Sequence, residues 1–225
     1  MSNNTIQSLD HNWQFQEEGQ EQWHEANVPG CVHQDLLNNK LIEDPFFRLN
    51  ESKYQWIMDK KWTYKLLFNS KNDILERKNK RLVFKGIDTY ADIYLNKSKI
   101  ISSNNMFHAW EVDVSELLKP ELNELKIVFH SPIKMVQPIM NEKSYQLPAD
   151  NDQAGDTSPY SRKAPYHYGW DWGPCLVTSG IWKNIELHGW DHWYIKRSAI
   201  LNKHANKQSA DLLLEVEVFS EINED

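Results

Sequence analysis

A run of alternating apolar residues limits what this chain can fold into. Trp62, Tyr64, Leu66 and Phe68 occupy every second position. Successive side chains of a β-strand point to opposite faces, so all four lie on the same face. Aromatic residues with this period form the inner face of a β-sandwich more often than an exposed platform for sugar rings. We therefore predict that this face belongs to a hydrophobic core.

Shorter segments repeat the same pattern along the chain. In one of them, at residues 91–95, Ile93 and Leu95 are expected on the same face, and a turn connects it to residues 99–101 in a β-hairpin. The remaining predicted strands are residues 11–16, 23–28, 82–87, 107–114, 125–129, 181–187, 193–201 and 212–219.

Few segments have helical spacing. We expect short helices at residues 32–41, 50–58 and 132–143, the last with a bend at Pro138, and a helical turn at 115–118. Residues 69–80 are polar and predict a surface loop, and residues 144–165 predict a long loop of the kind that is usually functional or disordered. Many short strands with turn signals between them predict an all-β fold, an antiparallel β-sandwich of jelly-roll type.

A domain boundary is expected at His188-Gly189. The jelly-roll sandwich then occupies residues 1–189. Two strands alone do not form a stable unit, so we expect residues 190–225 to be the truncated start of another sandwich. Their unpaired edges predict disorder in this segment or self-association with another chain.

Charge and composition exclude several classes of protein. The formal net charge is −7, which excludes nucleic acid as a partner, because phosphate binding needs basic surface. No apolar run is long enough to span a bilayer. The first residues lack the pattern of a signal peptide, which predicts a cytoplasmic location, or a periplasmic or secreted one if such a peptide was removed. Cys31 and Cys175 are expected as reduced structural thiols.

The stretch from Tyr166 to Pro174 predicts a sugar site. Aromatic rings can stack on the apolar faces of a sugar, and a carboxylate can accept hydrogen bonds from its hydroxyls. Asp171 stands between Trp170 and Trp172, and a carboxylate beside apolar rings is poorly solvated unless a group donates to it. The donors are sugar hydroxyls or, alternatively, Arg162, Lys163 or backbone N–H groups of the loop. In an extended chain the two tryptophans point to opposite sides, one toward sugar and the other into the core.

Three segments of this sequence resemble the β-mannosidases of glycoside hydrolase family 2, with matching order and spacing over roughly residues 9–195. The Trp170-Asp171-Trp172-Gly173-Pro174 segment is the most specific of them, and Lys97 departs from the pattern because glycine is common there. The segments are 28–46 with Trp56 and 62–64, then 84–96, and then 163–174 with 180–182.

The resemblance implies a retaining exo-β-mannosidase that removes terminal non-reducing β-D-mannose. The full protein should contain a galactose-binding-domain-like jelly roll, immunoglobulin-like sandwiches and a (β/α)8 barrel with two catalytic glutamates. Residues 190–225 should then be the truncated first strands of an immunoglobulin-like sandwich. Retention requires two carboxyl groups about 5–5.5 Å apart, and the resemblance places both in the barrel, so this chain should contain no catalytic residue and be inactive alone. Trp170, Asp171 and Trp172 should bind the β-mannoside substrate together with the barrel.

Other assignments stay open from the sequence. The chain could be a stand-alone carbohydrate-binding module, the same domain of an exo-β-hexosaminidase acting for example on chitosan, or a purely structural domain. Asp150, Asp152 and Asp156 lack the pattern of a calcium-binding EF-hand loop. We therefore expect a solvated acidic loop, no metal and no cofactor, with a structural calcium left open.

Two further residues invite a catalytic interpretation. Cys31 precedes His33 in a Cys-x-His pattern, but a structural cysteine at the start of a helix is the favoured interpretation over a thiol nucleophile. His167 is expected to be a structural, hydrogen-bonding residue and not a base, because no nucleophile is near it in the sequence.

Overall fold

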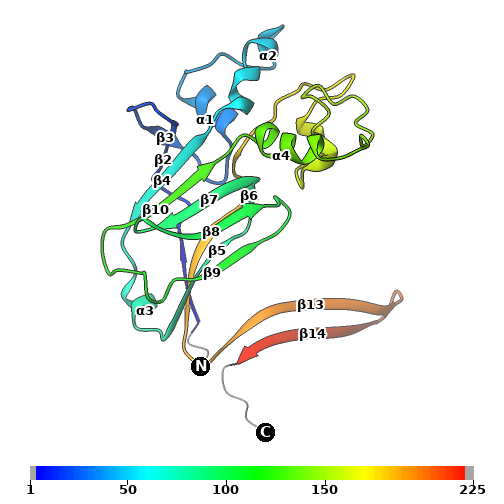
Figure 1. Ribbon diagram of the computed structural model, residues 1–225. Coiled ribbons are helices and arrows are strands. Elements are labelled where there is room, and N and C mark those ends of the chain that lie inside the picture. Colours follow the sequence, from blue (N-terminus) through cyan, green and yellow to red (C-terminus); the bar gives the residue numbers. More distant parts are fainter. Residues whose placement is uncertain (1–3, 221–225) are drawn as a thin grey trace.

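Antiparallel strands are the predominant regular elements of this computed structural model, which describes residues 4–220 (Figure 1). One sheet has the strand order β1-β12-β5-β9 and the other β3-β2-β4-β10-β7-β8. Small two-stranded sheets pair β11 with β6 and β13 with β14. Every pairing between named strands is antiparallel, so the predicted all-β antiparallel class is confirmed.

The elements follow one another along the chain with these bounds. The strands are β1 (Thr5–Ser8), β2 (Trp13–Glu17), β3 (His24–Ala26), β4 (Trp62–Phe68), β5 (Asn79–Phe84), β6 (Ile87–Asp88), β7 (Tyr90–Leu95), β8 (Ser98–Asn104), β9 (Trp110–Asp113), β10 (Asn123–Phe129), β11 (Gly180–Ile181), β12 (Ile185–Trp190), β13 (Trp193–Ala205) and β14 (Ala210–Ser220). The helices are α1 (Val32–Asn38), α2 (Asn50–Lys53), α3 (Asn72–Leu75) and α4 (Pro132–Asn141), with 3₁₀ turns η1 (Gln55–Asp59), η2 (Ser158–Tyr160) and η3 (Pro165–His167).

The two large sheets enclose the core. Trp62, Tyr64 and Leu66 of β4 are at most 2% exposed, which confirms the core assignment of this stripe. Phe84 of β5 and Leu187 of β12, from the other sheet, belong to the same cluster of buried apolar residues. Burying one such side chain contributes about 1.5–3 kcal/mol, so the alternation on β4 is a main source of stability. Ile93 and Leu95 are likewise fully buried, and β7 pairs with β8 in the expected hairpin.

Several predicted elements differ from the observed ones. The segment 69–80, expected to be a loop, contains α3 and the start of β5, because Ile74 is fully buried and anchors it among polar neighbours. The helix expected at 50–58 is interrupted at Tyr54 and continues as a 3₁₀ turn. The helical turn expected at residues 115–118 is observed, because the N–H groups of Leu117 and Leu118 both donate to the carbonyl of Val114. α4 continues for three residues beyond Pro138.

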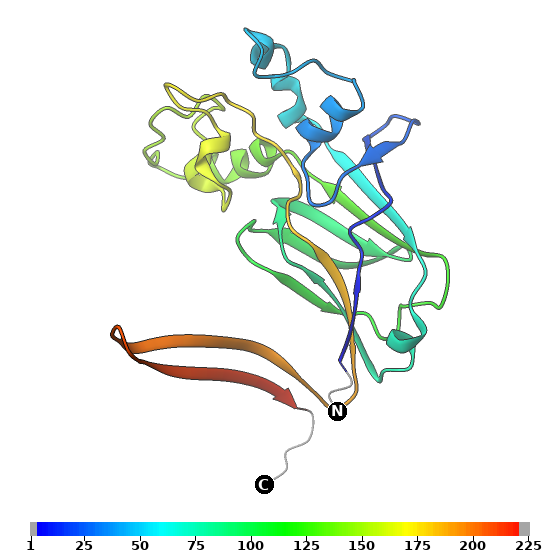
Figure 2. The ribbon, with the colours of Figure 1, turned by 180° about the vertical axis from the view of Figure 1, so that it is seen from behind.

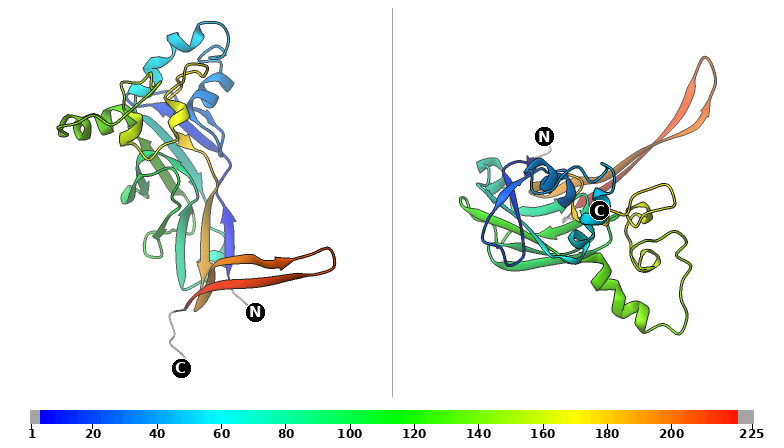
Figure 3. Two further views of the ribbon diagram at one scale, coloured as in Figure 1. Left: turned by 90° about the vertical axis from the view of Figure 1, so that its right-hand side faces the viewer. Right: turned by 90° about the horizontal axis from the view of Figure 1, so that it is seen from above.

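The hairpin of β13 and β14 extends away from the sandwich (Figure 3). Among residues 4–220, these strands pair only with each other. The disorder expected for this segment is therefore not observed at residues 193–220, and residues 221–225 lie outside the described residues. The boundary expected at His188-Gly189 lies within β12, which ends at Trp190.

Helices α1, α2 and α4 and the long loop gather at one end of the sandwich, whereas α3 lies at the other end, where the hairpin begins (Figure 1, Figure 2). The segment between α4 and β11 lies at the first of these ends, and it includes residues 166–174. No helix among residues 4–220 has the length and apolar character needed to cross a membrane.

Candidate functional site

Residues 166–176, named here the tip loop, form a small hairpin of their own. Tyr168 and Cys175 face each other in an antiparallel bridge. The backbone N–H of Trp170 donates to the carbonyl of Gly173 at 3.0 Å, and the N–H of Gly173 donates back to the carbonyl of Trp170 at 3.3 Å. These two bonds close a tight turn that has Asp171 and Trp172 at its tip.

Gly169 allows the chain to enter this turn. Its φ is +90°, a conformation that side-chain-bearing residues rarely adopt. A Cβ atom at this position would lie 3.0 Å from the side chain of Gln153 and 3.1 Å from Cβ of Cys175. Both backbone conformation and close packing therefore require glycine here.

Side chains from distant parts of the sequence form hydrogen bonds to the backbone of the tip loop. The side-chain amide of Gln153 donates to the carbonyl of Trp170 at 2.9 Å. Glu51 accepts a hydrogen bond from the N–H of Cys175 at 2.6 Å, and Gln55 donates to the carbonyl of Cys175 at 2.9 Å. The loop is thus fixed by α2, η1 and the long loop, while its tip faces outward.

The two tryptophans line one apolar groove. Their ring centroids are 5.4 Å apart with an angle of 55° between the planes, and Trp172 is 82% exposed. The groove has a volume of about 620 Å³ and is lined by Phe46, Pro165, Tyr166, His167, Trp170, Trp172, Gly173, Pro174 and Leu176. The expectation that the two rings point to opposite sides is wrong, because the backbone turns between them and is not extended.

Asp171 is exposed, and its carboxylate has no hydrogen bond or ion pair to any group within residues 4–220. Lys163, one internal partner considered for it, is instead bound to Asp88. Arg162 is exposed and forms no ion pair with Asp171 among the described residues. The carboxylate between the two indoles is therefore available to a donor from outside the chain.

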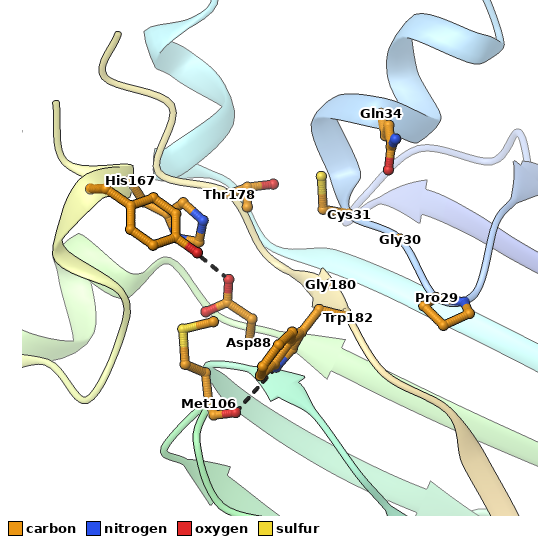
Figure 4. Close-up of a pocket in the computed structure, with 11 residues that line it drawn as sticks. Pro29, Gly30, Cys31, Gln34, Asp88, Met106, His167, Thr178, Gly180 and Trp182 are labelled. Carbon is orange, nitrogen blue, oxygen red and sulfur yellow. Dashed lines mark hydrogen bonds and ion pairs between the residues drawn. The ribbon is translucent and has the colours of Figure 1, made fainter. Parts of the chain in front are cut away.

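A buried ion pair lies at the base of the tip loop, and sequence reasoning did not find it. Lys163 Nζ donates to Asp88 Oδ2 at 2.5 Å and to the carbonyl of Thr178 at 2.8 Å. Asp88 borders a second cavity of about 300 Å³ that Cys31, His167 and Thr178 also line (Figure 4). Asp88 and Lys163 are 75 residues apart, so no local pattern could have associated them.

His167 is a half-buried residue beside this ion pair. Burial, with Lys163 nearby, lowers its pKa to about 4. Its Nδ1 lies 3.7 Å from Asp88 Oδ2 and has no hydrogen-bond partner within the described residues. The expected hydrogen-bonding role is therefore not observed for Nδ1, and an imidazole with this pKa is a weak base at neutral pH.

The remaining candidates have structural roles. Cys31 and Cys175 are free thiols, as predicted, with Cys31 at the N-cap of α1, and burial raises the pKa of Cys175 to about 12. Asp152 accepts hydrogen bonds from the N–H groups of Ala154 and Ser158. Within residues 4–220, no group of three or more His, Cys, Asp or Glu side chains is placed to hold a metal ion.

Known proteins are similar to this chain in sequence and in fold. A model of the family described as glycosyl hydrolase 2 galactose-binding domain-like matches residues 13–183. Beta-mannosidase B of Emericella nidulans is 38% identical over 186 residues, which are 80% of this chain and 22% of that protein. The beta-mannosidase of Capra hircus is 36% identical over 171 residues, which are 74% of this chain and 19% of that protein.

Solved structures extend the comparison. The beta-D-mannosidase from Dictyoglomus thermophilum matches with a TM-score of 0.88 and 38% identity, covering 96% of this chain and 26% of that one. A beta-glucuronidase from an uncultured Clostridium species has a TM-score of 0.60 at 17% identity over 97% of this chain and 34% of that one, a likeness of fold alone. The chain spans about a fifth of the length of the curated relatives it matches.

Proposed function

The chain belongs to the glycosyl hydrolase 2 galactose-binding domain-like family, and from this premise we propose that it is the non-catalytic β-sandwich of a retaining exo-β-mannosidase. The resemblance to β-mannosidases is confirmed by relatives of that name at 36–38% identity. The proposed whole enzyme removes terminal non-reducing β-D-mannose residues. This chain contributes the tip loop to the substrate pocket of a (β/α)8 barrel outside it.

The unpartnered carboxylate at the tip supports this proposal most directly. Asp171 is exposed, and the rings of Trp170 and Trp172 border the same apolar groove beside it. Such a site offers apolar surface to the C–H face of a sugar and an acceptor to its hydroxyls. Hydrogen bonds to a charged group are worth about 1.5–3 kcal/mol each, which is enough to orient a mannose unit.

The chemical step belongs to the barrel. A retaining glycosidase needs one carboxyl group as acid and base and a second as nucleophile, about 5–5.5 Å apart. Asp171 binds and orients the sugar, and the indoles exclude water from one side of the pocket. An apolar wall strengthens every charge interaction inside the pocket, because it lowers the local dielectric constant.

The C-terminal hairpin is a reason to propose a second sandwich in the whole enzyme. Leu212, Leu214, Val216 and Val218 occupy alternate positions of β14 and are 46–62% exposed. These alternating residues form one apolar face of the hairpin, which no other described element covers. We propose that this face is part of the core of an immunoglobulin-like sandwich in the whole enzyme.

Replacing Asp171 by alanine in the full-length enzyme tests the proposed role. Loss of one or two charged hydrogen bonds predicts a fall in kcat/KM on an aryl β-mannoside of about 10- to 100-fold. Asp150→Ala is the matched control, because Asp150 is an exposed aspartate of the neighbouring long loop. An Asp171→Ala enzyme with the kcat/KM of the control would remove Asp171 from the site.

A further inference from the structure

The buried ion pair of Lys163 and Asp88 lies where the tip loop joins the sandwich. Both side chains are at most 3% exposed. Lys163 precedes the tip loop in the sequence, and Thr178, whose carbonyl accepts the second hydrogen bond from Nζ, follows it. A single ammonium group therefore connects the two ends of the loop to each other and to Asp88.

Asp88 in turn is fixed within the sandwich. It is the last residue of β6 and lies opposite Gly180 of β11 in the register of that small sheet. Its second carboxylate oxygen, Oδ1, accepts a hydrogen bond from the hydroxyl of Thr89. The position of the carboxylate is thus fixed by the sandwich, and the ammonium group of Lys163 holds the loop in place relative to it.

Stability alone does not explain a pair in this position. Taking two charges out of water is unfavourable, and replacing both partners of a buried pair by uncharged residues of similar size is often neutral for stability. Removing only one partner is strongly destabilising, since it leaves a buried charge without compensation. The ion pair of Lys60 with Glu17, by comparison, is partly exposed, with side chains 45% and 20% accessible, and lies outside the tip loop.

We propose that Lys163 and Asp88 are positioning residues, which fix the two ends of the tip loop so that Asp171, Trp170 and Trp172 meet the sugar in one geometry. This inference rests on the proposed function of the tip loop. A displacement of about 1 Å in a positioned group can cost on the order of 100-fold in rate, so a small relaxation at the base of the loop has a large effect at its tip.

The test is a double variant of the full-length enzyme, Lys163→Met with Asp88→Asn. It removes both charges together and so avoids the unfolding expected for either single change, but it also removes the bond to Thr178. The matched control is Lys60→Met with Glu17→Gln, which removes an ion pair that shares no residue with the loop.

Two measurements are made on each variant. Hydrogen exchange follows the amides of Trp170, Gly173 and Leu176, which are bonded within the tip loop, against the core amides of β4 and β10. The value of kcat/KM on an aryl β-mannoside is measured with Asp171 present and in the Asp171→Ala background.

We expect the double variant to loosen the tip loop and leave the core unchanged. In the double variant, exchange in the tip loop becomes about tenfold faster or more while the core amides and the Tm stay near those of the control. Its kcat/KM falls about 10- to 100-fold with Asp171 present, and by a smaller factor when Asp171 is already alanine, since part of the effect acts through that carboxylate.

Three outcomes would overturn the inference: unchanged exchange in the tip loop, faster exchange with unchanged kcat/KM, or effects that simply add to those of Asp171→Ala. Failure of the proposed function looks different. In that case the wild-type enzyme does not cleave the β-mannoside, or Asp171→Ala alone has no effect, while exchange still reports whether the ion pair orders the loop.

Discussion

Two aspartates of this chain have opposite surroundings, and the difference defines their roles. Asp88 is buried and bound by Lys163 and Thr89. Asp171 is exposed and has no partner among residues 4–220. A buried carboxylate that is paired with an internal cation is suited to hold structure, whereas an exposed one without donors is free to bind a ligand. In the function proposed here, sugar binding at the tip loop depends on Asp171, and the geometry of the loop depends on Asp88.

Buried His33 and half-buried His167 make stability depend on pH. Burial lowers the pKa of both His33 and His167 from 6.5 to about 4. The folded state then binds fewer protons than the unfolded state, so stability is complete above pH 6.5 and is lost as the pH falls toward 4. One pKa unit corresponds to about 1.4 kcal/mol, so each histidine lowers the free energy of unfolding by up to about 3 kcal/mol across this range.

Asp35 has the opposite effect on the pH dependence of stability. Burial raises its pKa from 3.8 to about 6 although Asn27 and Tyr64 donate to it. The folded state binds the extra proton between pH 6 and 3.8, so this group adds stability as the pH falls. We expect urea unfolding of the 225-residue chain between pH 7 and 4 to show a net loss of stability. The loss should be steeper in Asp35→Asn, and a loss equal to or smaller than that of the wild type would contradict the assignment.

At the scale of elements, the local sequence pattern determines where the strands form, whereas contacts from other segments determine the conformation of the tip loop. β4 and β10 form where apolar residues alternate, because each buries one face in the core. The tip loop has few buried apolar residues and is held by polar contacts from α2, η1 and the long loop. Its conformation is therefore sensitive to single contacts.

Replacing Gly169 by alanine should destabilise the tip loop. Alanine at φ +90° is strained, and its Cβ would lie 3.0 Å from Gln153 and 3.1 Å from Cys175. We expect the free energy of unfolding to fall by about 1–3 kcal/mol. Gly19→Ala is the matched control, because Gly19 has φ +88° with no atom within 4 Å of the added Cβ. Equal losses in the two variants would show that the contacts at Gly169 contribute nothing.

The apolar face of the C-terminal hairpin should cause the 225-residue chain to self-associate. Leu214 is 61% exposed in a two-stranded sheet, and an uncovered sheet with unpaired edges invites pairing. We expect sedimentation to show concentration-dependent association that Leu214→Lys reduces. Glu215→Gln changes the net charge by the same amount and leaves the apolar face intact, so it should associate like the wild type. Association that persists equally in both variants would place the contact elsewhere.

At the scale of the whole molecule, the sandwich has the tip loop at one end and the hairpin at the other (Figure 1). The groove beside the two tryptophans is open to solvent, because Trp172, which lines it, is 82% exposed. Ligand sites usually bury most of the ligand surface, and this chain alone cannot do so for a mannose unit.

We therefore expect the 225-residue chain to bind mannose and mannobiose very weakly or not measurably. An NMR titration that follows the indole N–H signals of Trp170 and Trp172 measures this directly. A Kd well below about 1 mM, which corresponds to about 4 kcal/mol, would favour a stand-alone carbohydrate-binding module instead. Asp171→Ala would then be the control that locates the binding at the tip loop.

Much of the sandwich could be predicted from the sequence, and the exceptions have physical reasons. The β4 stripe was predictable because its period is set by the pleat of a single strand. Ile74 was not, since one apolar residue among polar neighbours has no period. The tight turn at residues 170–173 was also missed, because Gln153, Glu51 and Gln55 hold the loop from outside its own sequence.

The sequence by itself determined the all-β class, the apolar stripe of β4 that lies in the core, and the segment that carries Trp170, Asp171 and Trp172. These depend on residues within a few positions of one another, where strand geometry relates spacing directly to side-chain direction. Only the tertiary structure decided that the two indoles share one groove, that Asp171 has no internal donor, and that Lys163 binds Asp88 instead. Those properties depend on contacts between residues far apart in the chain, which form only when the two sheets pack.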